Sequence, residues 1–318
     1  MSTGLIYDPR FLEHDTGPGH PERPDRLRAI VQRLEADGLW DRLARLPFDT
    51  ANGARLERLH APRYVTRVHE ACAMGQPYID TVDSAICPAS DGLARLAVGG
   101  VLRAIGGVMK GEVGNAFCAV RPPGHHAEAD RSMGFCLFGT VALAAEALIA
   151  DHGLERVAIV DFDVHHGNGT QHLLEDRADV LFVSVHQNPQ TCYPGTGYAH
   201  EIGIGKGEGF TLNVPLPPGV GDSEYGAAFD RAILPRLEEF APQFLLLSAG
   251  FDAAAADPLA QMELSTEGFA GITERLLGVA RRHAEGRVVS VLEGGYDLDA
   301  LASGVAAHVG LLLDTAAG

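Results

Sequence analysis

Aspartate and histidine alternate in segment 161–165 (DFDVH), at the end of an apolar run. Side chains alternate faces along a strand, so Asp161, Asp163 and His165 are predicted to share one face. Two carboxylates this close repel one another unless a cation or proton lies among them. Asp plus His plus a third ligand, with one position left open, is typical of a catalytic zinc site. The segment therefore favours a divalent metal.

The third ligand is expected from the end of another strand. Asp252 follows the apolar run QFLLLSAGF and is the best candidate. Asp257 precedes Pro258, and this position is interpreted as a turn or a helix cap.

Two further clusters carry groups for proton transfer and oxyanion binding. His125 and His126 follow two prolines and a glycine in a tight loop. Adjacent side chains diverge, so paired acid–base roles are favoured over one shared metal. Tyr296 follows two glycines that permit a close backbone approach, and its hydroxyl is suited to stabilise an oxyanion. The alternatives are buried neutral imidazoles and a packed aromatic ring. Of the five cysteines, only Cys136 is a candidate nucleophile.

Apolar runs alternate with amphipathic stretches along the chain, and this pattern predicts an α/β fold with a parallel sheet covered on both faces. The predicted strands are 116–120, 156–162, 179–185, 210–214, 243–248 and 287–292. The predicted helices lie near 24–37, 62–74, 91–110, 137–152, 222–240, 266–284 and 298–313. Ligands bind beyond the carboxyl ends of such strands, where all the clusters above are found.

Composition excludes several classes of protein. The 318 residues include 25 Lys+Arg and 42 Asp+Glu, for a formal net charge of -17. Such a charge repels nucleic acid and attracts cationic substrates. Five cysteines without a CxxC pair indicate a reducing cytoplasm rather than a disulfide framework. No secretory signal and no apolar run of membrane-spanning length is predicted, and no P-loop, GxSxG or HExxH motif is present.

In this order, the clusters resemble the histone deacetylase superfamily of metal-dependent amidohydrolases, from Tyr7 to about Gly310. The matching stretches are HPERPDRL (20–27), RPPGHHAEADRSMGFC (121–136), VDFDVHHGNGTQ (160–171), SVHQNPQTCYPGTG (184–197), SAGFDAAAADPLAQM (248–262) and LEGGYDL (292–298). The HPERP and HHGNGTQ segments look like the class II branch and its bacterial relatives. The resemblance implies one arginase-like catalytic domain over residues 1–318, with a mostly parallel sheet of about eight strands and helices on both faces.

The resemblance also implies metals and acid–base roles. One Zn²⁺ per chain would be held by Asp163, His165 and Asp252. By family analogy His126 is the general base and later the general acid, whereas His125 is an electrostatic partner. A structural K⁺ is implied as well. The residues around it would be Asp161, Asp163, His165, Ser184 and Val185. Three of them, Asp163, His165 and Val185, would bind the ion through main-chain carbonyls.

Two residues are implied to hold the histidines. Asp161 would orient His125. Asn168 stands where class I members carry an Asp beside the second histidine, which is the class II pattern. A neutral partner should raise the basicity of His126 less than a carboxylate would.

The residues around the substrate are assigned by the same resemblance. Tyr296 matches the carbonyl-polarising tyrosine, which some catalytically poor vertebrate relatives replace by His. Gly134 and Phe135 match one wall of the tunnel for the acyl-lysine stem, and Tyr193 stands where the opposite wall is usually Phe. Asp83 resembles a rim aspartate that contacts the substrate backbone.

Leu259 lies seven residues after Asp252, in a loop expected to border the tunnel mouth. Polyamine-selective class II members carry Glu at the matching position. An apolar residue therefore predicts a preference for acetyl-lysine peptides over acetylspermidine.

We therefore expect a zinc-dependent amide hydrolase that removes acetyl or other short acyl groups from lysine side chains of peptides or proteins. Hydrolysis of acetylpolyamines or other small acyl-amines is the alternative at the same site. A two-Mn²⁺ ureohydrolase would need a further carboxylate where the chain has Gly167. A catalytically weak acetyl-lysine binding module is disfavoured by Tyr296. Self-association stays open, and neither nucleic acid nor a membrane is an expected partner.

Overall fold

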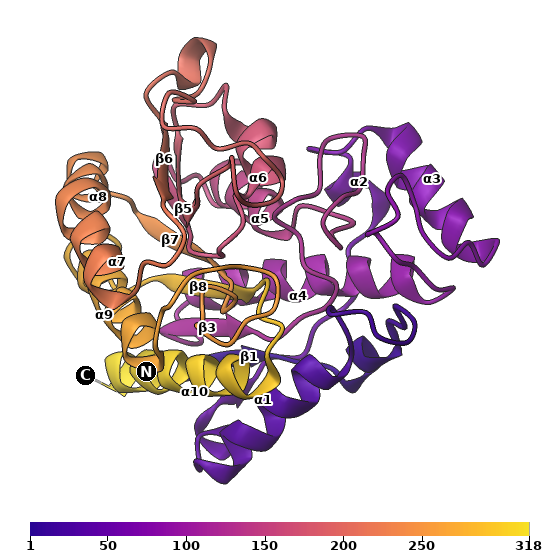
Figure 1. The fold of residues 1–318 in the computed structure, drawn as a ribbon, viewed down its shortest axis with the longest axis horizontal. Helices are drawn as coiled ribbons and strands as arrows, with labels where there is room; N and C mark the ends of the chain where they lie inside the picture. The colour runs from indigo at the N-terminus through magenta and orange to yellow at the C-terminus, as the bar shows by residue number, and fades with distance from the viewer. Residues whose placement is uncertain (318) are drawn as a thin grey trace.

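The core of the molecule is an eight-stranded sheet in the order β2-β1-β3-β8-β7-β4-β5-β6 (Figure 1). The computed structural model describes residues 1–317. Every neighbouring pair in this sheet is parallel. The strands are β1 (Thr3–Ile6), β2 (Ala44–Arg45), β3 (Asn115–Cys118), β4 (Val157–Asp161), β5 (Val180–Gln187), β6 (Thr211–Leu216), β7 (Phe244–Ala249) and β8 (Val288–Leu292).

The four central strands end at the same edge of the sheet. Asp161 of β4 is in register with Ser248 of β7, Ser248 with Val291 of β8, and Val291 with Cys118 of β3. All residues of these strands are buried, which explains their continuous apolar sequences. The loops after all four strands therefore start side by side.

Helices cover both faces of this sheet. On one face α4 and α5 contact each other and the central strands; on the other, α10 contacts both α1 and α9 (Figure 1). The α-helices are α1 (Asp25–Ala36), α2 (Gly53–Leu56), α3 (Pro62–Ala73), α4 (Ser90–Met109), α5 (Thr140–Ala150), α6 (Asn168–Leu174), α7 (Asp222–Ala228), α8 (Leu234–Phe240), α9 (Thr266–His283) and α10 (Leu298–Ala317). Short 3₁₀ turns span Pro9–Glu13, Trp40–Arg42 and Gly205–Gly207, and a π turn spans Phe229–Ile233.

The six predicted strands are present, each within two residues of its expected bounds. The sequence does not predict β1 and β2, because runs of four and two residues carry too little periodicity to recognise. It also misses α2 and α6, whose four and seven residues are too few for a helical period to be recognised. The helix expected over 222–240 is divided by the π turn, and Pro235 lies at the start of its second half.

Two helices meet a length and composition criterion for a membrane span, although no apolar run of that length was predicted. By length and composition alone, Ser90–Met109 and Leu298–Ala316 could cross a membrane. Within their most apolar windows, 61% and 50% of the residues are buried inside the protein. Both helices contact β1 and β3 from opposite faces, and this packing explains their apolar composition.

Candidate active site

Four loops meet beyond the carboxyl ends of β3, β8, β7 and β4. They carry the His125–His126 pair, Tyr296, Asp252 and the Asp163–His165 segment, respectively. Chemistry-bearing residues that are up to 171 positions apart in the chain thus converge, as the rule for parallel sheets predicts.

Asp163, His165 and Asp252 form a buried cluster whose ligand atoms all lie within 4.8 Å of one another. Nδ1 of His165 lies 3.1 Å from Oδ1 of Asp163 and 3.1 Å from Oδ2 of Asp252. Backbone N–H groups hold the carboxylates in place: Gly294 donates to Asp163 at 2.7 Å and Val164 donates to Asp252 at 2.9 Å. A Cβ atom at Gly294 would collide with both carboxylates, so only glycine permits this approach.

The charges of this cluster suit a bound cation. Burial raises the pKa of Asp252, and the neighbouring carboxylate of Asp163 raises it further. Burial acts to lower the pKa of His165, but its hydrogen bonds to Asp163 and Asp252 hold that pKa well above the usual value. Two buried carboxylates and an imidazole that converge in this way are a donor set that suits Zn²⁺. These three residues therefore fit the metal implied by the sequence.

Asp161 does not join this cluster, although alternation along a strand predicted one shared face. β4 ends at Asp161, so residues 162–165 do not follow strand geometry. The Asp161 carboxylate instead accepts a hydrogen bond from Nδ1 of His125 at 3.0 Å and one from the Asp163 N–H at 3.1 Å.

His125 and His126 are both buried, and their ring centroids are 4.0 Å apart. Burial acts to lower the pKa of His125, but the carboxylates of Asp163 and Asp161 raise it to about 10. Burial, together with the charges of His125 and His165, lowers the pKa of His126 well below its usual value. The pair thus combines an imidazolium with a neutral imidazole, which suits different roles in proton transfer.

Asn168, the first residue of α6, lies behind His126. Its Oδ1 is 2.7 Å from Nδ1 of His126. The preceding Gly167 packs against Asp161, and a Cβ atom there would collide with that carboxylate. A ligand for a second metal therefore has no room at this position, which argues against the two-metal alternative.

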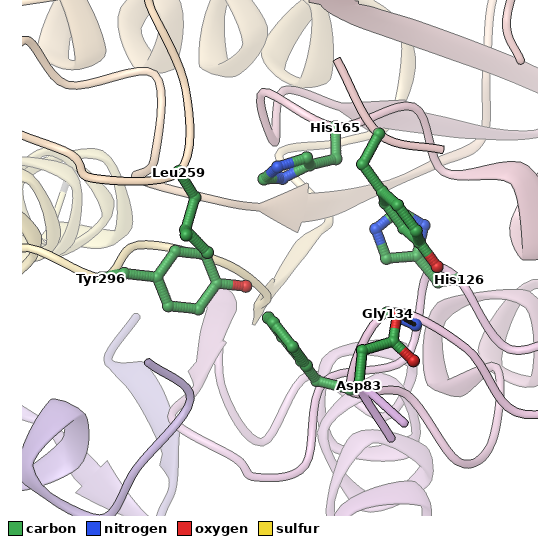
Figure 2. Close-up of a pocket in the computed structure, with 8 residues that line it drawn as sticks. Asp83, His126, Gly134, His165, Leu259 and Tyr296 are labelled. Atoms are coloured by element: carbon green, nitrogen blue, oxygen red, sulfur yellow. Dashed lines mark hydrogen bonds between the residues drawn. The ribbon is translucent and has the colours of Figure 1, made fainter. Parts of the chain in front are cut away.

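A cavity of about 240 Å³ leads to these residues. Its lining is Asp83, His126, Gly134, Phe135, His165, Tyr193, Leu259 and Tyr296. Figure 2 shows His126 and His165 on one side and Tyr296 on the other, with the Tyr296 hydroxyl directed into the space between them. All five residues expected around the substrate line this one cavity. Tyr193 and Leu259 are 40% and 39% exposed, so they belong to its outer part.

Asp257 has a structural role that sequence reasoning missed. Its Oδ1 accepts the Leu259 N–H at 2.9 Å, as expected of a turn residue. Its Oδ2 also accepts the Tyr296 N–H at 2.7 Å and the Asp297 N–H at 3.4 Å. One carboxylate thus holds both the loop of the candidate oxyanion donor and the loop at the cavity mouth.

A buried ionic cluster contacts the backbone of the Tyr296 loop. The sequence did not predict this cluster either. Arg121 donates to Glu22 at 2.5 and 2.7 Å, and Arg26 donates to Glu22 at 3.2 Å. Arg26 also donates to the Gly295 carbonyl at 2.7 Å. Despite burial, Arg121 lowers the pKa of Glu22 to about 2. Glu22 within the HPERP motif was the only indication of this cluster in the sequence, and nothing in the sequence indicated its arginine partners.

Cys136 is fully buried, and its thiol donates to the Gly134 carbonyl at 3.2 Å. Burial raises the pKa of this thiol well above its usual value. A buried thiol that stays protonated is a poor nucleophile, so Cys136 is a packing residue rather than a reactive one.

Comparisons with known proteins agree on one family. Residues 20–312 match the histone deacetylase domain. A probable deacetylase of Archaeoglobus fulgidus is 41% identical over 94% of this chain and 82% of its own length. The histone deacetylase-like amidohydrolase of Pseudomonas aeruginosa is 41% identical over 92% of this chain and 81% of its own. The polyamine deacetylase HDAC10 of Homo sapiens is 40% identical over 98% of this chain and 48% of its own. The crystal structure of the HDA15 HD domain superposes with a TM-score of 0.92 at 37% identity, covering 99% of this chain and 90% of that one.

Proposed function

The chain belongs to the histone deacetylase family, and we propose that it is a zinc-dependent hydrolase that removes acetyl or other short acyl groups from lysine side chains of peptides or proteins. One observation carries this proposal: a neutral imidazole and a phenol face one another across a cavity that also reaches His165 of the candidate metal cluster. A base, an oxyanion donor and a metal are the groups that amide hydrolysis requires.

The mechanism follows from the positions of the side chains. A Zn²⁺ held by Asp163, His165 and Asp252 would supply Lewis acidity toward a carbonyl oxygen and toward water. Nε2 of His126 would accept the proton of the attacking water and later deliver it to the amine that leaves. The Tyr296 hydroxyl would donate a hydrogen bond to the developing oxyanion. A new C–O bond replaces the C–N bond, and the products are a carboxylate and a free amine.

The experiment that tests the function is a substrate panel. kcat/KM should be measured on acetyl-lysine peptides, acetylpolyamines and longer acyl-lysine peptides, with and without a chelator. Release of the free amine that stops on chelation supports the proposal. No turnover of any member by the metal-loaded protein would favour an acetyl-lysine binding module instead.

His126→Ala is expected to be more damaging than His125→Ala. The lowered pKa of His126 leaves it free to accept a proton, whereas the raised pKa of His125 keeps it charged. Loss of the base should reduce kcat by about 10²–10⁴-fold. Steady-state rates and metal content of both variants check this. Equal losses, or the reverse order, would contradict the assignment of roles while leaving the site itself in place.

Leu259 tests selectivity between lysine peptides and polyamines, the alternative that the HDAC10 relative favours. Leu259→Glu should shift the kcat/KM ratio toward acetylspermidine by about 1–2 kcal/mol, because a carboxylate at the mouth attracts the distal ammonium. Leu259→Gln is the matched neutral control, and added salt should weaken the shift. A wild type that already prefers acetylpolyamines strongly would refute the role of Leu259 in substrate selectivity. Asp83, which also lines the cavity, would then be the acidic residue to examine.

We also propose a structural K⁺ beside Asp161, Asp163, His165, Ser184 and Val185. Asp161 and Ser184 are fully buried and paired in register between β4 and β5, which supports the presence of polar ligands there.

We also propose the domain organisation, the cellular compartment and the partners of the enzyme. Residues 1–318 would form a single catalytic domain, built on the one sheet described above. The five cysteines are free thiols, which fits a reducing cytoplasm. The net charge of -17 disfavours nucleic acid as a partner.

A further inference from the structure

A continuous chain of side-chain hydrogen bonds runs from His126 toward the surface. Nδ1 of His126 lies 2.7 Å from Oδ1 of Asn168, and Nδ2 of Asn168 lies 2.5 Å from Oε1 of Glu128. Nδ1 of His172, on α6, lies 2.8 Å from the same Glu128 oxygen. Asn168 is buried, whereas the side chains of Glu128 and His172 are 20% and 41% exposed. This series of hydrogen bonds thus links a buried candidate base to a carboxylate near solvent.

The chemistry of these groups dictates the direction of each hydrogen bond. An ionised carboxylate only accepts, so the group of Asn168 that faces Glu128 must be its NH₂. The amide oxygen then faces His126, and because this oxygen also only accepts, Nδ1 of His126 must carry the hydrogen. In a neutral imidazole that leaves Nε2 unprotonated and able to accept a proton. The weaker acceptors near the same amide nitrogen are Sδ of Met133 at 3.3 Å and the His126 carbonyl at 3.4 Å.

Glu128 also supplies a charge that Asn168 lacks. A neutral amide beside His126 stabilises an imidazolium less than a carboxylate would. Glu128 places a full negative charge directly behind that amide, in a short charge-assisted hydrogen bond that polarises the amide toward His126. Residue 168 therefore supplies no negative charge beside His126, but Glu128 supplies one a single side chain farther away.

We propose that Glu128 is a positioning residue that acts through Asn168: it fixes the protonated nitrogen of His126 and stabilises the imidazolium formed during the reaction. This inference rests on the proposed role of His126 as the general base. Asn168 would transmit the orientation and the charge but would not itself release a proton.

A reciprocal exchange of amide and carboxylate tests the proposal. Glu128→Gln keeps shape and an acceptor for Asn168 but removes the charge, so kcat/KM should fall about 5–10-fold. Asn168→Asp in the wild-type background brings two carboxylates together and should also reduce kcat/KM. The double variant Glu128→Gln/Asn168→Asp restores one carboxylate and one amide in exchanged positions. It should recover to within about threefold of wild type.

The matched control is Glu175→Gln. This change removes the same charge from a residue that influences His172 but is not a member of the hydrogen-bond chain. Its kcat/KM should stay at the wild-type value. Tm and bound zinc, measured for every variant, separate an effect on His126 from unfolding or metal loss.

Two outcomes would overturn the proposal: Glu128→Gln within twofold of wild type, or a double variant no more active than the weaker single variant. Failure of the proposed function is distinguishable, because in that case the wild type would lack amide hydrolysis or His126→Ala would retain it.

Discussion

Asp252→Ala is expected to lose bound zinc and to reduce amide hydrolysis by about 10³-fold or more, because metal catalysis supplies several kcal/mol of transition-state stabilisation. Asp252 is the one member of the candidate metal cluster that lies in the loop after β7, and its Oδ2 lies 3.1 Å from Nδ1 of His165. Without it, Asp163 and His165 alone offer two ligands, one fewer than the three protein ligands of a catalytic zinc site. Metal content per chain and kcat/KM, measured on the same preparation, check this.

Folding of the Asp252 variant must be tested separately from metal binding. Asp252→Asn is isosteric and retains an acceptor for the Val164 N–H. The raised pKa of Asp252 means that its ionised form destabilises the metal-free protein at neutral pH. Neutral Asn should therefore leave the metal-free protein at least as stable as wild type, while zinc is still lost. Asp230→Ala, an exposed aspartate paired with Arg275, is the control that should keep its metal. Full activity of a metal-free preparation would refute the metal site.

The sheet and the metal cluster could be predicted because each depends on a local pattern. Fully buried parallel strands appear in the sequence as continuous apolar runs, and the ends of such strands meet at one edge. Asp163, His165 and Asp252 each follow such a run directly. The residues that β1 and β2 contribute are too few for a pattern of this kind, and both strands were missed.

Three supporting carboxylates could not be predicted, because their partners are distant in sequence and no motif indicated them. Asp257 contacts the backbone of Tyr296, 39 positions away, and Glu22 contacts Arg121, 99 positions away. Glu128 reaches Asn168 across 40 positions. Hydrogen bonds between loops follow no period in the sequence, and only the folded structure brings their partners together. The strand argument also misplaced Asp161, because the sequence does not reveal that β4 ends at that residue.

Tyr296→Phe is expected to reduce kcat by about 10²–10³-fold, the usual cost of removing one oxyanion donor. Burial raises the pKa of Tyr296 well above its usual value, so its hydroxyl remains a donor at neutral pH. Among the described residues, no hydrogen bond involves this hydroxyl, which points into the cavity (Figure 2). Its substitution should therefore leave the fold intact. KM should change little, because the oxyanion forms only in the transition state.

The matched control is Tyr193→Phe, which removes the other phenol that lines the cavity. Tyr193 is 40% exposed at the outer part of the cavity, so its loss should affect KM more than kcat. If Tyr296→Phe stays within a few-fold of wild type, Tyr296 is only a packing residue against Phe135, whose ring centroid lies 5.7 Å away. If the variant instead binds acetyl-lysine peptides with unchanged Kd but no longer hydrolyses them, binding and turnover are separate properties of this cavity. Turnover of the same peptides by the wild type would show that the protein is an enzyme rather than a binding module.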